Sequence, residues 1–337
     1  MNKAYLLFCV AILPILIYST VARNTVWQNE LSSWGDIVAK NPSKPRGYNS
    51  LGLAYAGHGK YEKALELYEQ AIYLYKKRGG PKEGLYNTYV NRGVAYVNMK
   101  RFDKAINEYN MAISLFPDFA VAYNNRGVAY ISQKHPEKAL EDFNKALALN
   151  SAYVDAYKNR GYYYFNNERY DDAIGDFTAA IRINPDNPSF YGIRGKAYVK
   201  QREYVKAIED LDRAISANSG EPSFYVNRGL AFDHTGQSLN AIRDYNKAAL
   251  LDPRDARTYM NRGIAYGKQS LYDKAIQDFN AAIALDPDNA DVYHNRGYAS
   301  YLNGMHTAAI ADFKKACSLG NKTACDSLRH VLNKRKN

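Results

Sequence analysis

Apolar and small residues recur through most of the chain at spacings typical of helices. They return at intervals of three, four and seven residues, which places them along one face of a helix. The whole pattern repeats every 34 residues, and each copy carries one glycine at the same place. The first interval is 41 residues, which is one period plus a seven-residue insertion at 79–85. These glycines define eight repeats: Gly52, Gly93, Gly127, Gly161, Gly195, Gly229, Gly263 and Gly297.

Two helices are predicted in each repeat when the glycine is numbered position 8. Position 4 is tyrosine in all eight repeats, and position 11 is aromatic in seven, so both face the same side of a first helix. Positions 20 and 27 are always alanine, and position 24 is aromatic in seven repeats, which predicts a second helix. Small residues at positions 8 and 20 let the two helices approach closely. Proline at position 32 of four repeats ends the second helix.

This period and residue pattern resemble the tetratricopeptide repeat (TPR). The resemblance implies an all-α fold, a right-handed α-solenoid of eight helix pairs that binds segments of other proteins. The expected repeats are 45–78, 86–119, 120–153, 154–187, 188–221, 222–255, 256–289 and 290–323. Because the open ends of such an array need covering, we expect a capping half-repeat at 24–44. A capping helix with a basic tail is expected at 324–337.

The N-terminus holds an uncharged apolar run of 19 residues, from Ala4 to Ala22. This length spans a bilayer as a helix, so residues 1–23 are predicted to be a single transmembrane anchor. The residues Thr20-Val21-Ala22 also resemble a signal-peptide cleavage site, so a secreted or periplasmic protein is the alternative. Both interpretations place the repeats outside the cytoplasm if the N-terminus stays inside.

Arginine replaces the usual leucine of the TPR pattern at position 7 of repeats 2 to 8. The same seven repeats carry an acid at position 23, whereas repeat 1 has Leu51 and Leu67 at these two positions. Because both positions change together, we predict structural ion pairs between the two helices of a repeat. A row of arginines that binds a ligand is the alternative. The predicted pairs include Arg126 with Asp142 and Arg160 with Asp176.

The TPR resemblance also implies a peptide groove lined by positions 2, 5, 9, 12 and 13 of the first helices. Large apolar residues occupy several of these positions, and lysines flank two of them. Such a surface suits an extended segment with apolar and acidic residues. Packing of the same side chains between neighbouring helices is the alternative. The candidate groove residues are Lys158, Tyr162, Phe165, Lys196, Lys200, Tyr298 and Tyr301.

Two cysteines stand near the C-terminus, Cys317 in the last repeat and Cys325 in the predicted capping helix. Their spacing resembles the helix-linking cysteines of Sel1-like repeat proteins, which implies a disulfide. Two unrelated buried thiols are the alternative. Disulfides persist mainly in oxidising compartments, so this pairing is tied to an extracytoplasmic location.

Charge and composition exclude several classes of function. The net charge is +11, but no dense basic stripe with interleaved aromatics is present, so no nucleic acid is expected as a partner. The histidines, cysteines and acids have no metal-ligand spacing, and no catalytic triad has a local signature. The glycines stand singly inside helices and cradle no phosphate. The sequence therefore predicts neither an enzyme nor a cofactor, and other proteins as partners.

A second resemblance covers the junction after the apolar run. It looks like the junction of transmembrane-and-TPR O-mannosyltransferases and their bacterial relatives, although this chain has only one membrane segment. We therefore expect a membrane-anchored scaffold for envelope complex assembly. An accessory or substrate-presenting subunit of a membrane glycosyltransferase is the alternative. The matching residues are Arg23, Asn24, Trp27, Glu30, Trp34, Pro42, Arg46, Asn49, Ser50, Leu51 and Gly52.

Overall fold

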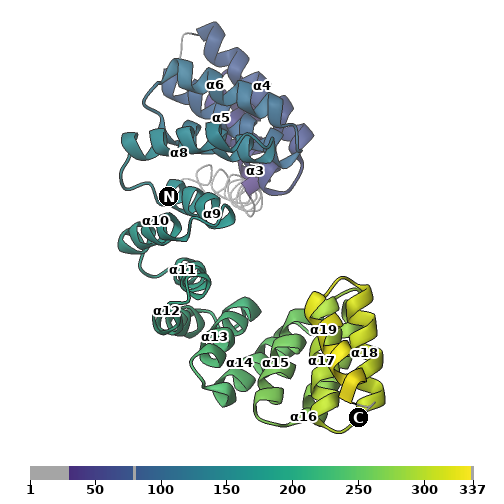
Figure 1. The fold of residues 1–337 in the computed structure, drawn as a ribbon. Coiled ribbons are helices and arrows are strands. Elements are labelled where there is room, and N and C mark those ends of the chain that lie inside the picture. The colour runs from purple at the N-terminus through teal and green to yellow at the C-terminus, as the bar shows by residue number, and fades with distance from the viewer. Residues whose placement is uncertain (1–29, 79–80, 335–337) are drawn as a thin grey trace, which may run out of the picture. The chain divides into compact units, whose positions relative to one another are not determined.

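The computed structural model describes residues 30–78 and 81–334 (Figure 1). Within these ranges every regular element is a helix, so the predicted all-α repeat array is confirmed there. The chain divides into two compact units, of which the first ends at Arg160 and the second begins at Gly161.

Eighteen helices, α2 to α19, cover the described residues. The earlier helices are α2 (Glu30–Lys40), α3 (Pro45–Gly57), α4 (Tyr61–Arg78), α5 (Lys82–Asn98), α6 (Phe102–Leu115), α7 (Ala120–Ser132), α8 (Pro136–Leu149) and α9 (Val154–Asn166). The later helices are α10 (Tyr170–Ile183), α11 (Pro188–Lys200), α12 (Tyr204–Ala217), α13 (Pro222–His234), α14 (Ser238–Leu251), α15 (Ala256–Lys268), α16 (Tyr272–Leu285), α17 (Ala290–Leu302), α18 (His306–Ser318) and α19 (Lys322–Lys334).

The glycine at position 8 is in direct contact with the residue at position 24, which is aromatic in seven repeats. A Cβ atom built on Gly93 would lie 2.5 Å from Cε1 of Tyr109, a distance that real Cβ atoms do not reach. The equivalent distance from Gly127 to Cε1 of Phe143 is 2.7 Å. Tyr109 and Phe143 are each 1% exposed. The aromatic ring of the second helix therefore packs directly on the backbone of the first, which only glycine allows.

The turn between the two helices of a repeat has the same backbone shape throughout. Position 15 has a positive φ in every repeat, with glycine in three of them and other residues, such as Lys100 at 58°, in the rest. The insertion between repeats 1 and 2 changes the lengths of the two helices that flank it. It lets α4 continue to Arg78 and α5 begin at Lys82, so both helices are longer than their counterparts.

Helices cover both ends of the array. Helix α2 packs against α3 at the N-terminal end, and α19 packs against α18 at the other. Val331 of α19, 5% exposed, joins Ile310 and Phe313 in one apolar cluster. Helix α19 begins at Lys322, where the side chain of Asn321 accepts a hydrogen bond of 2.7 Å from the backbone N–H of Ala324.

The predicted transmembrane helix at 1–23 lies outside the described residues. Among the helices of residues 30–78 and 81–334, none has the length and apolar character that a bilayer-spanning helix needs.

Candidate functional site

The arginines at position 7 bind the acids at position 23 through two parallel hydrogen bonds. In six repeats the Nε and Nη2 atoms donate to the two carboxylate oxygens over 2.6 to 2.9 Å. Arg126 and Asp142 are one such pair. Arg160 is the last residue of the first unit, and its Nη1 donates to Asn144 of that unit at 2.6 Å. Asp176 belongs to the second unit. Their predicted pairing stays a prediction.

The arginines of repeats 3 to 8 also reach the preceding repeat, a contact that was not predicted from the sequence. In each case Nη1 donates to the side chain at position 25 of that repeat, as in Arg126 to Asn110 at 2.5 Å and Arg194 to Thr178 at 2.9 Å. The signal was present, because position 25 is a short polar residue in repeats 2 to 7. In repeat 8, which no further arginine follows, it is Lys314. A guanidinium held by three helices is structural, which disfavours the interpretation as a ligand-binding row.

A groove runs along the first helices of the second unit. One hollow of about 600 Å³ lies between α11, α13 and α15, and an adjoining hollow of about 260 Å³ extends it to Tyr162. Both are lined by Lys196, Glu221, Ser223 and Asn227, so they form one groove, here named the lysine groove. Its larger hollow adds Lys200 and several apolar residues, among them Val226, Leu230 and Met260.

Lys196 and Lys200 have no acidic partner in the lysine groove, whereas Arg257 in the same groove is paired with Asp255 at 3.2 Å. Among the described residues, no carboxylate lies within salt-bridge distance of Lys196 or Lys200. Burial lowers the pKa of Lys196, and the positive charges of Arg257 and Lys200 lower it further. Its Nζ atom lies over the ring of Phe165, 5.0 Å from the ring centre, a favourable cation–π distance.

The acids that line the same groove are engaged at the starts of helices and turns. Glu221 and Asp255 cap α13 and α15, accepting from the backbone N–H groups of Ser223 and Arg257 at 3.4 Å. Asp252 accepts from the backbone N–H of Arg254 at 3.1 Å. These carboxylates stabilise the N-termini of their segments. They are therefore poorly placed to neutralise the two lysines.

Of the two predicted aromatic residues of α9, Tyr162 lines the smaller hollow of the lysine groove, and Phe165 lies under Lys196. Tyr162 is 39% exposed. Its ring and the buried ring of Phe177 pack edge to face, with their centres 5.5 Å apart. Phe165 is half-buried and packs edge-on against Tyr170, also at 5.5 Å. Each ring packs against an aromatic residue of its own repeat, and the charged end of Lys196 lies over the ring of Phe165.

The remaining predicted groove residues do not join the lysine groove. Lys158 belongs to the first unit, where it pairs with Asp155 at 2.6 Å and lines a separate hollow of about 300 Å³. Tyr298, 56% exposed, lines a different hollow of about 380 Å³ between α15 and α17. Tyr301 packs toward α18, with its ring 5.2 Å from that of His306. Repeat position alone did not distinguish these surroundings.

Asparagines at position 6 were also missed. This amide lines the hollows of both units, and an amide can donate to and accept from a peptide backbone. Two of them bond to the preceding repeat, Asn91 to Asn49 at 3.0 Å and Asn159 to Asn124 at 2.9 Å. The signal was their recurrence in six repeats: Asn91, Asn125, Asn159, Asn227, Asn261 and Asn295.

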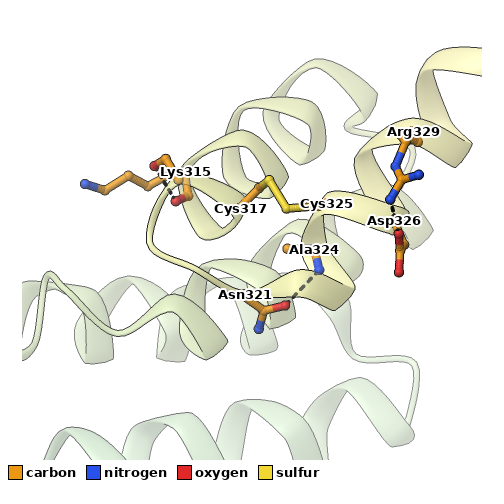
Figure 2. The surroundings of a disulfide bond; sticks show 8 residues. Lys315, Cys317, Asn321, Ala324, Cys325, Asp326 and Arg329 are labelled. Atoms are coloured by element: carbon orange, nitrogen blue, oxygen red, sulfur yellow. Dashed lines mark hydrogen bonds and ion pairs between the residues drawn. A yellow bond between two sulfur atoms is a disulfide. The ribbon is translucent and has the colours of Figure 1, made fainter.

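Cys317 and Cys325 form a disulfide between α18 and α19, with a Cα–Cα distance of 4.8 Å (Figure 2). The bond attaches the capping helix to the last repeat. No cluster of three or more histidine, cysteine or acidic side chains suited to a metal occurs in the described part of the chain.

Comparison with known proteins identifies the repeat family. Sequence profiles of the tetratricopeptide repeat match residues 45–118, 120–153, 154–187, 193–259, 256–289 and 279–311. No curated protein matches the chain at a significant level. The resemblance to O-mannosyltransferase relatives is not supported by these comparisons.

Solved structures share the fold. YrrB, described as a TPR protein with an unusual peptide-binding site, is 26% identical; the match covers 55% of this chain and 96% of YrrB with a TM-score of 0.50. PilF of Pseudomonas aeruginosa is 18% identical over 63% of this chain and 96% of its own, with a TM-score of 0.56. The Cut9–Hcn1 structure is 14% identical over 94% and 95%, with a TM-score of 0.55. The chain belongs to the tetratricopeptide repeat family.

Proposed function

We propose that this protein is a scaffold whose lysine groove binds acidic segments of other proteins. The TPR fold suggests a protein-interaction role, and proteins of this family are generally scaffolds that lack catalytic activity. The observation that carries the proposal is the placement of Lys196 and Lys200. Both line a groove beside Val226, Leu230 and Met260 without a carboxylate partner.

Electrostatics favours a carboxylate as the group bound there. Like charges at Arg257 and Lys200 disfavour the charged form of Lys196. A bound carboxylate would offset that repulsion, and a half-buried site strengthens the attraction because water screens it less. The apolar lining supplies contact area for the rest of the segment. An extended segment that mixes acidic and apolar residues fits both features.

The scaffold is proposed to act outside the cytoplasm, held at the membrane by the apolar run Ala4–Ala22, in the assembly of envelope complexes. Two features support this location. The run has the length of a membrane-spanning helix. The disulfide between Cys317 and Cys325 belongs to an oxidising compartment.

A peptide-display selection on the full-length protein tests the binding proposal. Random peptides that bind should be richer in aspartate and glutamate than the starting library. The affinity of one selected peptide should fall at least tenfold in the double variant Lys196→Glu, Lys200→Glu, and it should also fall as salt rises.

A matched pair of charge reversals provides the control. Lys206 and Lys247 are exposed on the second helices α12 and α14, and neither lines the lysine groove. The variant Lys206→Glu, Lys247→Glu changes the net charge equally. If it weakens binding as much as the groove variant, long-range charge explains the binding and the groove is not the site.

A further inference from the structure

Gly267 differs from the residues at position 12 of the other repeats. Two of those residues, Val97 and Val199, line the hollows of their own units. Gly267 lines the hollow between α15 and α17, and a Cβ atom built on it meets nothing within 4 Å. Gly263 in the same hollow is different, because its Cβ would lie 2.7 Å from Phe279. Packing therefore requires glycine at 263 and leaves position 267 free.

No local backbone requirement explains Gly267 either. Glycine is less favourable than alanine within a helix, and Gly267 lies in the last turn of α15. The residue that adopts the left-handed conformation after this helix is Ser270, with a φ of 57°. The absence of a side chain at 267 thus creates open space that neither the packing nor the turn needs.

The hollow beside Gly267, here named the glycine pocket, has apolar walls. Phe279, 2% exposed, forms its floor, and Tyr298 and Leu302 stand at its edge, 56% and 44% exposed. Ile264, Tyr272 and Ala299 add to this lining. The one charged lining residue is Lys268, whose Nζ atom is paired with Asp233 at 2.7 Å. An apolar group suits this pocket better than a carboxylate, because the charge at its mouth is already neutralised.

We propose that the glycine pocket receives one bulky apolar side chain, such as leucine, of the same acidic segment that occupies the lysine groove. Helix α15 connects the two surfaces: Met260 and Asn261 line the lysine groove, and Ile264 and Gly267 line the glycine pocket one turn further on. The unpaired lysines select the acidic segment by charge, and the pocket selects a residue within it. The inference rests on the proposed function and adds a sequence requirement to it.

A spacing series of synthetic peptides tests this requirement. Each peptide carries two adjacent glutamates and one leucine in a glycine–serine background, and the leucine moves one residue at a time on either side. Fluorescence anisotropy with the full-length protein measures each affinity. One or two spacings should bind about tenfold more tightly than the peptide without leucine, the gain expected for burying one such side chain.

Filling the pocket should remove that gain. In Gly267→Leu, the best leucine peptide should bind no better than the peptide without leucine, whose own affinity stays unchanged. Gly175→Leu is the matched control, because Gly175 also lies inside a helix, α10, with nothing within 4 Å of its added Cβ. Gly175→Leu should still bind the best leucine peptide about tenfold more tightly than the peptide without leucine.

The outcomes separate the two proposals. If glutamate peptides bind but no leucine spacing helps, or if Gly267→Leu keeps the gain, the pocket proposal is wrong and the lysine groove stands. If no glutamate peptide binds, the proposed function fails. The pocket is then tested alone by titrating N-acetyl-leucinamide and following the methyl NMR signals of Ile264 and Leu302. Shifts present in the unsubstituted protein and absent in Gly267→Leu would support it; no shifts would overturn it.

Discussion

Replacing Arg126 by leucine would remove a guanidinium that joins three helices of the first unit. Its Nε and Nη2 donate to Asp142 at 2.8 and 2.7 Å, and its Nη1 donates to Asn110 of the preceding repeat at 2.5 Å. After the substitution, Asp142 would keep its charge at a site where it is only 5% exposed. We expect the free energy needed to open repeat 3 to fall.

The magnitude follows from the burial of the pair. Removing one partner of a buried ion pair costs about 3–5 kcal/mol. The side chain of Arg126 is 19% exposed, so water partly screens the site and a loss near the lower end, about 3 kcal/mol, is expected. Adding Asp142→Leu should recover most of it. Repeat 1 shows that an apolar pair fits, since Leu51 and Leu67 occupy the same two positions at 8% and 9% exposure.

The loss should also depend on pH. Burial raises the pKa of Asp142 even though Arg126 acts against the rise. Without Arg126 this pKa rises further, so the folded variant binds a proton more tightly than the unfolded chain does. Protonation then stabilises the variant as pH falls through the folded-state pKa. The deficit relative to the unsubstituted protein should therefore be largest at neutral pH and shrink in mild acid.

Native-state hydrogen exchange of α7 and α8, followed by mass spectrometry, is the suitable assay. A repeat array need not unfold in one step, so local opening is more informative than a global melting curve. Additive losses from Arg126→Leu and Asp142→Leu would refute the pairing argument. If the loss of opening free energy in Arg126→Leu is the same at neutral and mildly acidic pH, lost packing causes it and not an unpaired carboxylate.

Three further predictions concern the groove and the cap. Affinity for acidic peptides should fall as pH rises through the lowered pKa of Lys196, because only its charged form attracts a carboxylate; Lys196→Arg should move this fall to higher pH in the same binding titration. Tyr162→Ala with Phe165→Ala should weaken peptide binding more than it lowers the melting temperature, and the reverse would assign both rings to the core. Replacing Cys317 and Cys325 by serine should destabilise α19 by about 2–3 kcal/mol in hydrogen exchange. Free alkylation of both cysteines in membrane-derived protein would contradict the disulfide.

The helix pairs could be predicted because their packing residues are the same in every repeat. Gly93 and Tyr109 illustrate this, since the ring fits only where the opposite backbone carries no Cβ. Arginine at position 7 was equally visible, because it changes together with position 23. Both signals are pairs of positions that constrain each other within one repeat.

The rest of the network and much of the groove could not be predicted in this way. In repeats 2 to 7, position 25 holds asparagine, threonine or aspartate, such as Asn110, Thr178 and Asp212. These residues share the ability to accept a hydrogen bond but not a residue type. Lys158 and Tyr301 were grouped with the groove by position number. Their actual partners, Asp155 and His306, depend on the local sequence of their own repeats.

Departures from the repeat pattern are therefore the most informative residues of this chain. Equivalent positions have equivalent neighbours in a repeat array, so a change at one of them points to a difference in surroundings. Lys314 occurs where no arginine follows to be bound, and Leu51 occurs where its partner position is also apolar. Gly267 has ordinary repeats on both sides and open space around its missing side chain. The apolar side chain proposed for the glycine pocket would occupy that space, which the packing of the repeats leaves empty.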